Sequence, residues 1–223
     1  MNGRILAVYG NMVVARTDGR VVQNSVARCH RRDGARLMSE VIRVRGGLAD
    51  LQVFEETRGL RVGDVVEFGD EMLSVTLGPG LLGQIYDGLQ NPLPEIARRS
   101  GYFLTPGQSV PGLPQQRRWA FTPTAHVGDT VEAGDMLGTV DEGIFKHRIM
   151  VPFAWRGRFT VLEIEEAGEF AVSDRVAALT DASGAERPVT MQQNWPVKVQ
   201  LSIARQRLLP EEPLVTRVRI IDS

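Results

Sequence analysis

Residues 77–93 read Leu77-Gly78-Pro79-Gly80-Leu81-Leu82-Gly83-Gln84-Ile85-Tyr86-Asp87-Gly88-Leu89-Gln90-Asn91-Pro92-Leu93, and this stretch separates two β-like parts of the chain. Gly78-Pro79-Gly80 excludes a regular element, because proline fixes φ and lacks an N–H donor while glycine admits positive φ. Beyond it, apolar residues recur at helical spacing, namely Leu81, Leu82, Ile85 and Leu89. Gly88 and Asn91-Pro92 are typical of a helix end. The spacing therefore predicts a short helix after Gly80 that packs its apolar face on a core.

The part before this stretch is predicted to be a succession of short strands. Five runs are rich in β-branched and other apolar residues: 5–15, 21–29, 37–44, 48–54 and 65–68. Turn residues separate them, and the Asp18-Gly19, Asp33-Gly34 and Gly46-Gly47 pairs suit tight hairpins. Short strands at this spacing, with no helical period between them, predict a small closed β-barrel in a mainly β fold.

The part after residue 93 is predicted to hold one more short helix and a second β-rich domain. The helix is expected across residues 94–99, because proline is tolerated in a first turn. Prolines and glycines crowd residues 105–114 and mark a linker, so a new domain is expected to begin near Arg117. Within it, residues 161–165 and 170–179 are predicted strands.

The new domain has a compact pattern of two Gly-Asp turns. Gly128-Asp129 and Gly134-Asp135 flank Val131, which is similar to the small β-sandwich of biotinyl and lipoyl carrier domains. Lys146 follows the second turn, and a carrier protein that uses Lys146 as its modified lysine is therefore an alternative function. Phe145 and His147 flank this lysine, whereas carriers have Met-Lys-Met or Asp-Lys-Ala. We therefore expect Lys146 to bear neither biotin nor lipoate.

Length and composition indicate a globular protein. With 223 residues, 43% of them hydrophobic, the chain can bury one large core or two small ones. No apolar run approaches the ~20 residues of a membrane span, and the first residues lack the regions of a signal peptide. We expect a cytoplasmic protein without direct membrane insertion. The single cysteine, Cys29, excludes an intramolecular disulfide and is expected to be a partly buried, inert thiol.

Charge is unevenly distributed along the chain. Residues 1–50 contain nine arginines and four acidic residues, which leaves +5, while the whole chain carries −1. The densest patch, Arg28, Arg31, Arg32 and Arg36 around His30, makes a nucleic-acid-binding barrel a second alternative. A single-strand groove needs aromatic stacking platforms, however, and this part holds only Tyr9. We therefore expect no nucleic-acid partner.

Residues 77–93 resemble the Gly-Pro-Gly-Leu-Leu … Asp-Gly-x-Gln-x-Pro-Leu signature of the catalytic A subunit of rotary V-type ATPases. The residues that carry the signature are Gly78, Pro79, Gly80, Leu81, Leu82, Asp87, Gly88, Gln90 and Pro92. Other segments resemble the same family in the same order: residues 39–42, 52–60, 148–152 and 194–197, the last with Trp195 and Pro196. Residues 212–223 resemble the strand and turn that lead to the family's phosphate loop, with Arg217 where glycine usually stands. The resemblance covers the whole chain and the N-terminal portion of the family's length.

The resemblance implies a division of the chain. Residues 1–69 would be an N-terminal β-barrel and 70–114 the first segment of an α/β nucleotide-binding domain with a linker. Residues 115–186 would be an inserted barrel-sandwich-like domain without a modified lysine, and 187–223 the return segment that stops before the phosphate loop.

The resemblance also implies a function for the parent complex. That complex lies peripheral to the membrane and couples ATP hydrolysis or synthesis to proton or sodium transport, with ATP and Mg in the parent subunit. The implied partners are B subunits and other A subunits of a ring, and a peripheral stalk subunit through residues 115–186. This piece would supply assembly surfaces.

The sequence contains no recognisable catalytic motif. ATP hydrolysis on this fold needs a Gly-x-x-x-x-Gly-Lys-Ser/Thr loop, and neither of the two lysines, Lys146 and Lys198, follows a glycine. His30, His126 and His147 lack the spacing of metal ligands. We therefore predict no catalytic, cofactor-binding or metal-binding residue here, and no ATP turnover by the chain alone.

Overall fold

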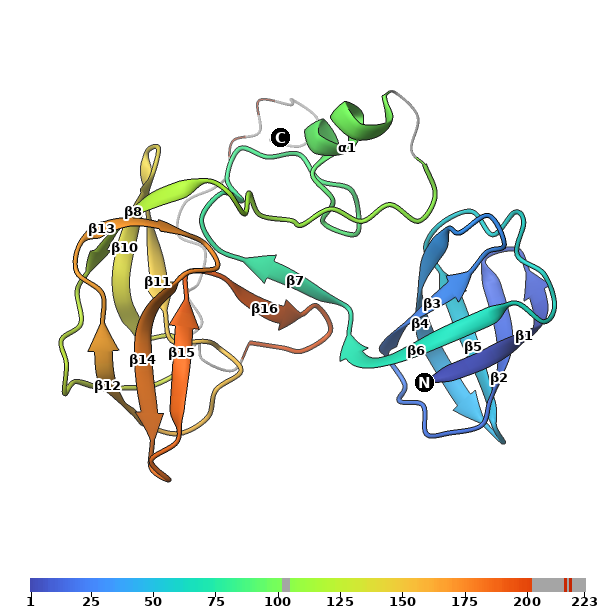
Figure 1. Ribbon diagram of the computed structural model, residues 1–223, viewed down its shortest axis with the longest axis horizontal. Helices are drawn as coiled ribbons and strands as arrows, with labels where there is room; N and C mark the ends of the chain where they lie inside the picture. The colour runs from blue at the N-terminus through green and yellow to red at the C-terminus, as the bar shows by residue number, and fades with distance from the viewer. Residues whose placement is uncertain (102–104, 202–214, 216, 218–223) are drawn as a thin grey trace.

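The computed structural model describes residues 1–101, 105–201, 215 and 217, and its N-terminal part is a closed β-barrel (Figure 1). The barrel strands are β1 (Asn2–Tyr9), β2 (Met12–Thr17), β3 (Ser25–His30), β4 (Arg36–Arg45), β5 (Leu48–Val53) and β6 (Val65–Met72). They pair in the order β1-β2-β5-β4-β3-β6, and β6 closes the barrel on β1. The predicted mainly β fold with a small closed barrel is confirmed.

The barrel encloses a core of its own. Alternating residues of its strands point inward, as the period of two requires, and Ile5, Val13, Leu37, Leu51 and Val66 are fully buried. All members of this cluster lie between residues 5 and 68. The barrel therefore needs no apolar contact with the rest of the chain to complete its core.

The predicted single strand over residues 5–15 is wrong. Tyr9 pairs with Met12 in a hairpin of β1 and β2, and Gly10 adopts a φ of +60° in the turn. The apolar pattern runs on through both strands, so only Gly10 and its neighbour Asn11 could have signalled the turn. The strand predicted over 21–29 likewise begins later, at Ser25, after Asn24 at φ +67°.

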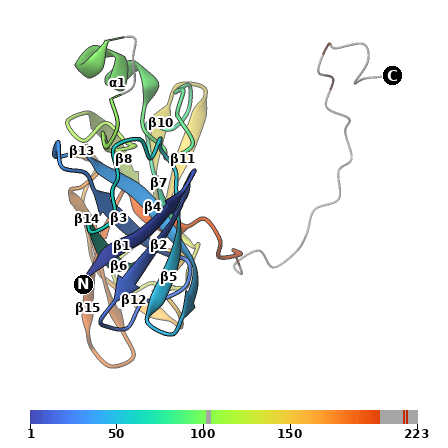
Figure 2. The same cartoon turned by 90° about the vertical axis from the view of Figure 1, so that its right-hand side faces the viewer.

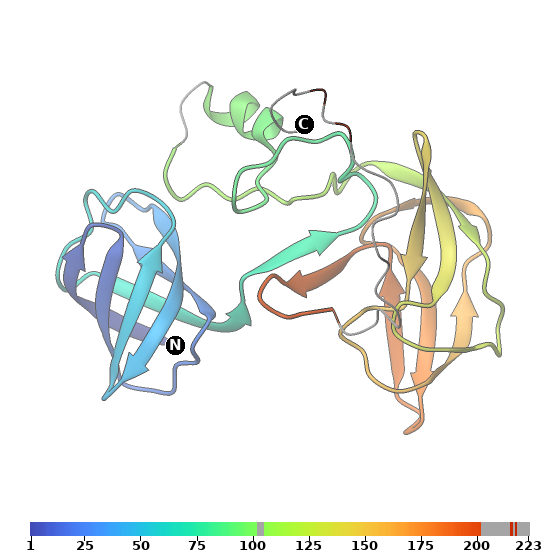
Figure 3. The same cartoon turned by 180° about the vertical axis from the view of Figure 1, so that it is seen from behind.

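A two-stranded ribbon lies between the barrel and the second β-rich body. Strand β7 (Ser74–Leu77) pairs antiparallel with β16 (Gln193–Pro196), and Val75 lies opposite Trp195. Figures 1 and 3 show this ribbon from opposite sides of the molecule. In the ribbon, the strand that leads into the second body, β7, therefore lies beside the strand that leads out of it, β16.

Helix α1 (Leu93–Ser100) confirms the short helix predicted over 94–99. Pro94 lies in its first turn, Ile96 is its buried residue, and Glu95 forms ion pairs with Arg98 and Arg99 one turn later. Figure 2 shows the helix at one end of the molecule, beyond the ends of the sheets.

The second body is a sandwich of two four-stranded sheets. One sheet has the order β11-β10-β8-β13 and the other β15-β14-β12-β9. The bounds are β8 (Arg118–Pro123), β9 (Thr130–Val131), β10 (Met136–Glu142), β11 (Phe145–Met150), β12 (Phe159–Ile164), β13 (Gly168–Ala171), β14 (Arg175–Asp181) and β15 (Glu186–Thr190). The sheets enclose two apolar clusters, one around Phe121 and one around Phe159.

Repeated aspartate turns shape both bodies. At the two Gly-Asp turns, the Asp129 carboxylate accepts a hydrogen bond from His126 N and the Asp135 carboxylate one from Glu132 N, each at 2.7 Å. Asp64 in the barrel accepts from the residue three positions before it in the same way. The side chain satisfies a backbone donor within its own turn, as aspartate commonly does.

The same kind of turn explains a second wrong strand. Residues 170–179 are not one strand, because β13 ends at Ala171 and β14 begins at Arg175. Asp174 accepts a hydrogen bond from Ala171 N at 2.8 Å and reverses the chain between them. The sequence does not reveal this break, because apolar residues, Val172 and Val176, continue on both sides of the turn. Both are buried in the structure.

The segment predicted to lead toward a phosphate loop, residues 212–223, lies almost entirely outside the described residues. Within the described part of the chain, no helix is long and apolar enough to cross a bilayer.

Candidate functional site: the signature loop and the contacts between bodies

The signature stretch is a loop between β7 and α1, and the helix predicted after Gly80 is wrong. Gly80 and Gly83 adopt φ values of +103° and +74°, which a right-handed helix cannot contain. Leu82 and Ile85 are 50% and 66% exposed, so half of the expected apolar face packs on no core. Helical spacing alone misled here because glycines interrupt it at two positions.

Polar side chains of the signature hold the loop in place of helical hydrogen bonds. Asp87 accepts hydrogen bonds from the backbone N–H groups of Leu89 and Asn91 at 2.9 and 2.8 Å, and from the Asn91 side chain. Gln90 bonds both backbone groups of Thr76 on β7 at 2.7 Å. Asp87 and Gln90 therefore stabilise the fold of the loop itself.

The start of the loop is buried against the sandwich. Residues 78–80 are buried, and Leu81 packs against the cluster that contains Trp119 and Leu113. A Cβ added to Gly80 would lie 2.8 Å from Pro114 and 3.2 Å from Trp119, in addition to its unfavourable φ. Glycine is therefore required at position 80 by both conformation and space.

Glu142, at the end of β10, connects the loop to the sandwich. Its Oε1 accepts hydrogen bonds from Gly80 N at 2.7 Å and Leu82 N at 3.2 Å. Its Oε2 lies 3.0 Å from His147 Nδ1 on β11. The residue is 9% exposed, so a buried carboxylate meets three hydrogen-bonding partners.

The return segment completes the junction. Thr76 Oγ1 on β7 donates to Asn194 Oδ1 on β16 at 2.9 Å. Trp195 is half-buried, packs edge-on against Phe153 and donates from Nε1 to Val199 O at 2.9 Å. These contacts favour a packing role for Trp195 over a ligand-stacking role.

Within the described residues, polar contacts join the barrel to the rest of the chain at two places. In the first, Lys198 Nζ lies 2.7 Å from Glu40 Oε1 and 3.5 Å from Asn24 Oδ1. Glu40 is buried on β4 of the barrel, while the Lys198 side chain is 48% exposed. The lysine follows the return strand β16, so this ion pair spans 158 residues of sequence between barrel and ribbon.

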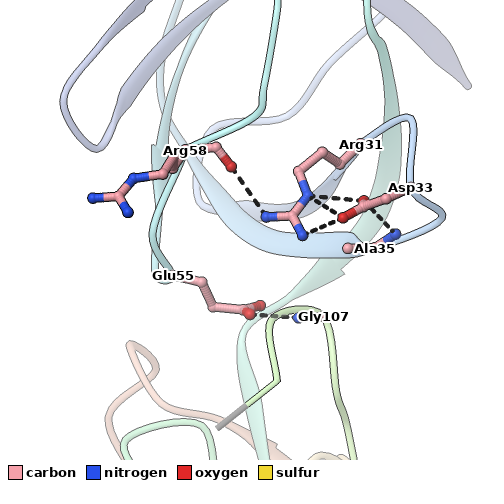
Figure 4. Close-up of polar contacts among 6 residues, drawn as sticks. All are labelled: Arg31, Asp33, Ala35, Glu55, Arg58 and Gly107. Atoms are coloured by element: carbon pink, nitrogen blue, oxygen red, sulfur yellow. Dashed lines mark hydrogen bonds and ion pairs between the residues drawn. The ribbon is translucent and has the colours of Figure 1, made fainter.

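Glu55 makes the second barrel contact, drawn in Figure 4. Its Oε2 accepts a hydrogen bond from Gly107 N in the proline-rich linker at 2.5 Å, and its Oε1 accepts one from Met38 N at 3.4 Å. A Cβ at Gly107 would lie 2.7 Å from Arg36 N, and Gly107 has a φ of +79°. The linker backbone therefore reaches the barrel wall only because residue 107 is glycine.

Two of the four arginines in the basic patch, and His30 itself, are paired with carboxylates. Arg31 pairs with Asp33 and donates to Arg58 O at 3.0 Å (Figure 4), and this pairing lowers the pKa of Asp33 to about 2. Arg32 lies 3.6 Å from Asp64, and His30 bonds Glu67, whose pKa it lowers. Over residues 1–69, eleven arginines meet eight acidic residues, a net of +3. This pairing argues against an open phosphate-binding face.

The remaining predicted positions lie apart from one another. Lys146 is exposed on β11, opposite Asp141. Cys29 is fully buried in the barrel, more than expected, and burial raises the pKa of its thiol to about 11, which suits an inert role.

Side chains that could bind a metal ion are dispersed in the described residues. Within residues 1–101 and 105–201, no three histidines, cysteines or carboxylates lie close enough to bind a metal ion together. Lys198 pairs with Glu40, and Lys146 lies on a strand away from any glycine-rich turn.

Sequence reasoning missed the three carboxylates that join the bodies, Glu40, Glu55 and Glu142. Glu40 and Glu55 lie in segments 39–42 and 52–60, which resemble the family. The resemblance gave these two residues no structural role. Glu142 had a signal of its own, since it falls in phase with the buried Gly138 and Val140 along β10. A carboxylate on the inward face of a strand needs partners.

Comparison with known proteins matches two family models to separate parts of the chain. The beta-barrel domain of the ATP synthase alpha/beta family matches residues 5–69, and the ATP synthase alpha/beta subunit barrel-sandwich domain matches residues 110–198. The second range includes the end of the linker, residues 110–114, and the return strand β16 as well as the sandwich.

Whole-chain relatives agree with these matches. The chain is 48% identical over 221 residues to a V-type ATP synthase alpha chain of Treponema denticola, covering 99% of this chain and 37% of the relative. It is 47% identical to one of Borrelia recurrentis and 46% to one of Borreliella burgdorferi, covering 99% of this chain and 38% of each relative. The chain thus spans less than two-fifths of the length of these relatives.

Proposed function

This chain belongs to the ATP synthase alpha/beta family and matches the N-terminal portion of V-type alpha chains, and from that premise we propose that it supplies assembly surfaces of a rotary ATP synthase. In this proposal the parent complex couples ATP hydrolysis or synthesis to proton or sodium transport. The single observation that carries it is the pair of matched domains, barrel and barrel-sandwich, in one chain related over its whole length to V-type alpha chains.

The barrel is proposed to bind neighbouring barrels of B and A subunits in a ring. A self-contained core supports this role, because the barrel surface is then available for partners. Its net charge of +3 over residues 1–69 would speed association with an acidic neighbour. Exposed ion pairs contribute only about 0–1 kcal/mol each, so apolar contacts would have to hold such a ring.

The sandwich, with residues 115–186, is proposed to face a peripheral stalk subunit. ATP and Mg are proposed to bind the parent subunit outside the described residues, which lack a phosphate loop and a set of metal ligands. The complex would lie on the cytoplasmic side, peripheral to the membrane. The chain alone is therefore expected to be monomeric or weakly associating and inactive toward ATP.

Sedimentation velocity of the chain, alone and mixed with its cognate B subunit, tests the proposal. We expect a monomer alone and a faster boundary with the B subunit that weakens as salt rises. A stable homohexamer, or no binding to the B subunit even at low salt, would contradict it. Turnover of Mg-ATP above a mock preparation would contradict the assignment of the ATP site elsewhere.

The same preparation separates the alternatives. Intact mass should equal the sequence mass, whereas biotin or lipoate on the Lys146 peptide would support a carrier. A salt-dependent mobility shift with oligonucleotides would support the alternative that the barrel binds nucleic acid.

A further inference from the structure

We propose that Glu142 is a positioning residue that sets the orientation of the sandwich on the signature segment, and that Gly78-Pro79-Gly80 is the docking element it holds. The inference concerns contacts within this chain and does not depend on the proposed assembly. It assigns to Gly80 of the signature a partner in the β10–β11 hairpin.

The geometry begins with the donors of the loop. A loop that turns sharply at Gly-Pro-Gly leaves backbone N–H groups without a helical or strand partner, and a buried N–H must find one. Gly80 N is such a donor in a buried residue, and Leu82 N follows it on the same side. Both converge on one oxygen atom, Glu142 Oε1, at 2.7 and 3.2 Å.

The acceptor is rigid because the sandwich holds it. Glu142 pairs with Phe145 across the β10–β11 hairpin, and its second oxygen lies 3.0 Å from His147 Nδ1 on the neighbouring strand. A carboxylate fixed at one oxygen presents the other in a defined direction. Hydrogen bonds to a charged acceptor are also stronger than neutral ones.

Apolar packing at the same place leaves orientation undefined. Leu81 contacts the sandwich cluster, and Arg117 covers the Trp119 ring at 3.8 Å beside Gly80. Such contacts favour burial without specifying direction, since the hydrophobic effect is non-directional. The pair of hydrogen bonds to Glu142 Oε1 supplies the direction.

Hydrogen exchange on the full chain tests this inference. In Glu142→Leu, which keeps the bulk and removes the acceptors, we expect the Gly80 and Leu82 amides to exchange at least tenfold faster. Glu142→Gln keeps an amide oxygen for the loop and should restore exchange to within about threefold of the parent chain. The matched control is Glu169→Leu, an exposed carboxylate on β13 of the same sheet, which should leave both amides unchanged.

Distance measurement between spin labels reads the orientation directly. One label goes on the exposed Ala97 of α1 and one on the exposed Ala182 in the β14–β15 turn, each as a cysteine substitution, with the buried Cys29 changed to alanine. We expect a narrow distance distribution in the parent background, a broad one with Glu142→Leu and a narrow one again with Glu142→Gln.

Two results would overturn the inference. One is an unchanged distance distribution in Glu142→Leu while its Gly80 amide exchanges normally. The other is equal broadening in Glu142→Leu and Glu142→Gln, which would make the loss of the negative charge, and not the loss of the acceptor, the cause. If Glu142→Leu fails to fold, His147→Ala decides the matter, because it removes the group that fixes Glu142 Oε2. The Gly80 and Leu82 amides should then exchange faster than in Glu142→Gln, and exchange as slow as in the parent chain would overturn the inference.

Discussion

The barrel and the sandwich are both antiparallel β-structures, but they attach to the rest of the chain in opposite ways. The barrel closes on itself around a core made only of its own residues. In the described residues, its contacts with the ribbon and the linker are polar, through Glu40 and Glu55. The sandwich leaves its sheets open and shares a cluster with linker residue Leu113, with Met191 before β16 and with Leu81 of the loop. The difference indicates that the barrel is an autonomous unit, whereas the sandwich and signature loop form one.

The chain carries a separate native probe for each unit. Its three tryptophans, Trp119, Trp155 and Trp195, all lie outside the barrel, and its one cysteine, Cys29, is buried inside it. Tryptophan fluorescence therefore follows the sandwich and ribbon, and thiol reactivity follows opening of the barrel. No introduced label is needed to compare the units.

Core truncation should give the largest effects. Leu51→Ala in the barrel should cost about 2–5 kcal/mol and Phe121→Ala in the sandwich about 3–5 kcal/mol, because both side chains are buried. Leu51→Ala should shift the urea midpoint of Cys29 labelling and leave the tryptophan midpoint in place. Phe121→Ala should do the reverse and also expose the signature loop to exchange.

Each truncation is the control for the other. If both probes shift together in both variants, the two bodies unfold as one cooperative unit and the comparison fails.

Alkaline pH should separate the units by a smaller amount. The Cys29 pKa is raised from its ordinary 9.0 to about 11 in the folded barrel. Because the folded state holds the proton more tightly, this stabilisation is fully present below pH 9 and is lost as pH rises through 11. The slope is at most about 1.4 kcal/mol per pH unit.

The direct measurement is thiolate absorbance near 240 nm, with Cys29→Ala as the blank. We expect titration near pH 11 in the folded chain and near 9 in urea. A folded thiol that titrates at its ordinary pKa would refute the assignment.

The contrast between the bodies also explains what the sequence could predict. Alternating apolar residues and the Gly46-Gly47 and Asp33-Gly34 pairs sufficed to predict a barrel, although not the β1–β2 turn. Three of its six strand pairs are local hairpins, β1-β2, β3-β4 and β4-β5, and its apolar core lies within residues 5–68. The short helix α1 could also be predicted, from Pro94, which is tolerated in a first turn.

The signature loop could not be predicted in the same way. Its apolar spacing is helical, but its conformation depends on Glu142, 62 residues away from Gly80, and on the β16 strand beyond the sandwich. The turn at Asp174 could not be predicted either, because the apolar residues on its two sides, Val172 and Val176, look like parts of one strand. A hydrogen-bond acceptor that lies far away along the chain produces no periodic pattern in the sequence.

The smallest predicted effect concerns the ion pair that joins the barrel to the ribbon. Lys198→Met removes the ammonium beside the buried Glu40 and should lower barrel stability by about 1 kcal/mol. A fully buried pair would cost more, but the Lys198 side chain is 48% exposed, so water partly replaces the lost partner. The measurement is the urea midpoint of Cys29 labelling, at low and at high salt.

The other lysine of the chain supplies the control. Lys146→Met removes the same charge from an exposed position on β11, and it should leave the barrel midpoint unchanged. Because screening weakens an exposed charge more than a buried one, salt should narrow the difference between Lys198→Met and the parent without abolishing it. Equal effects of the two substitutions would mean that net charge, and not the contact with Glu40, sets barrel stability. A midpoint shift with Lys198→Met that also appears in tryptophan fluorescence would mean that this contact couples the two units, and the barrel would then be less autonomous than its private core indicates.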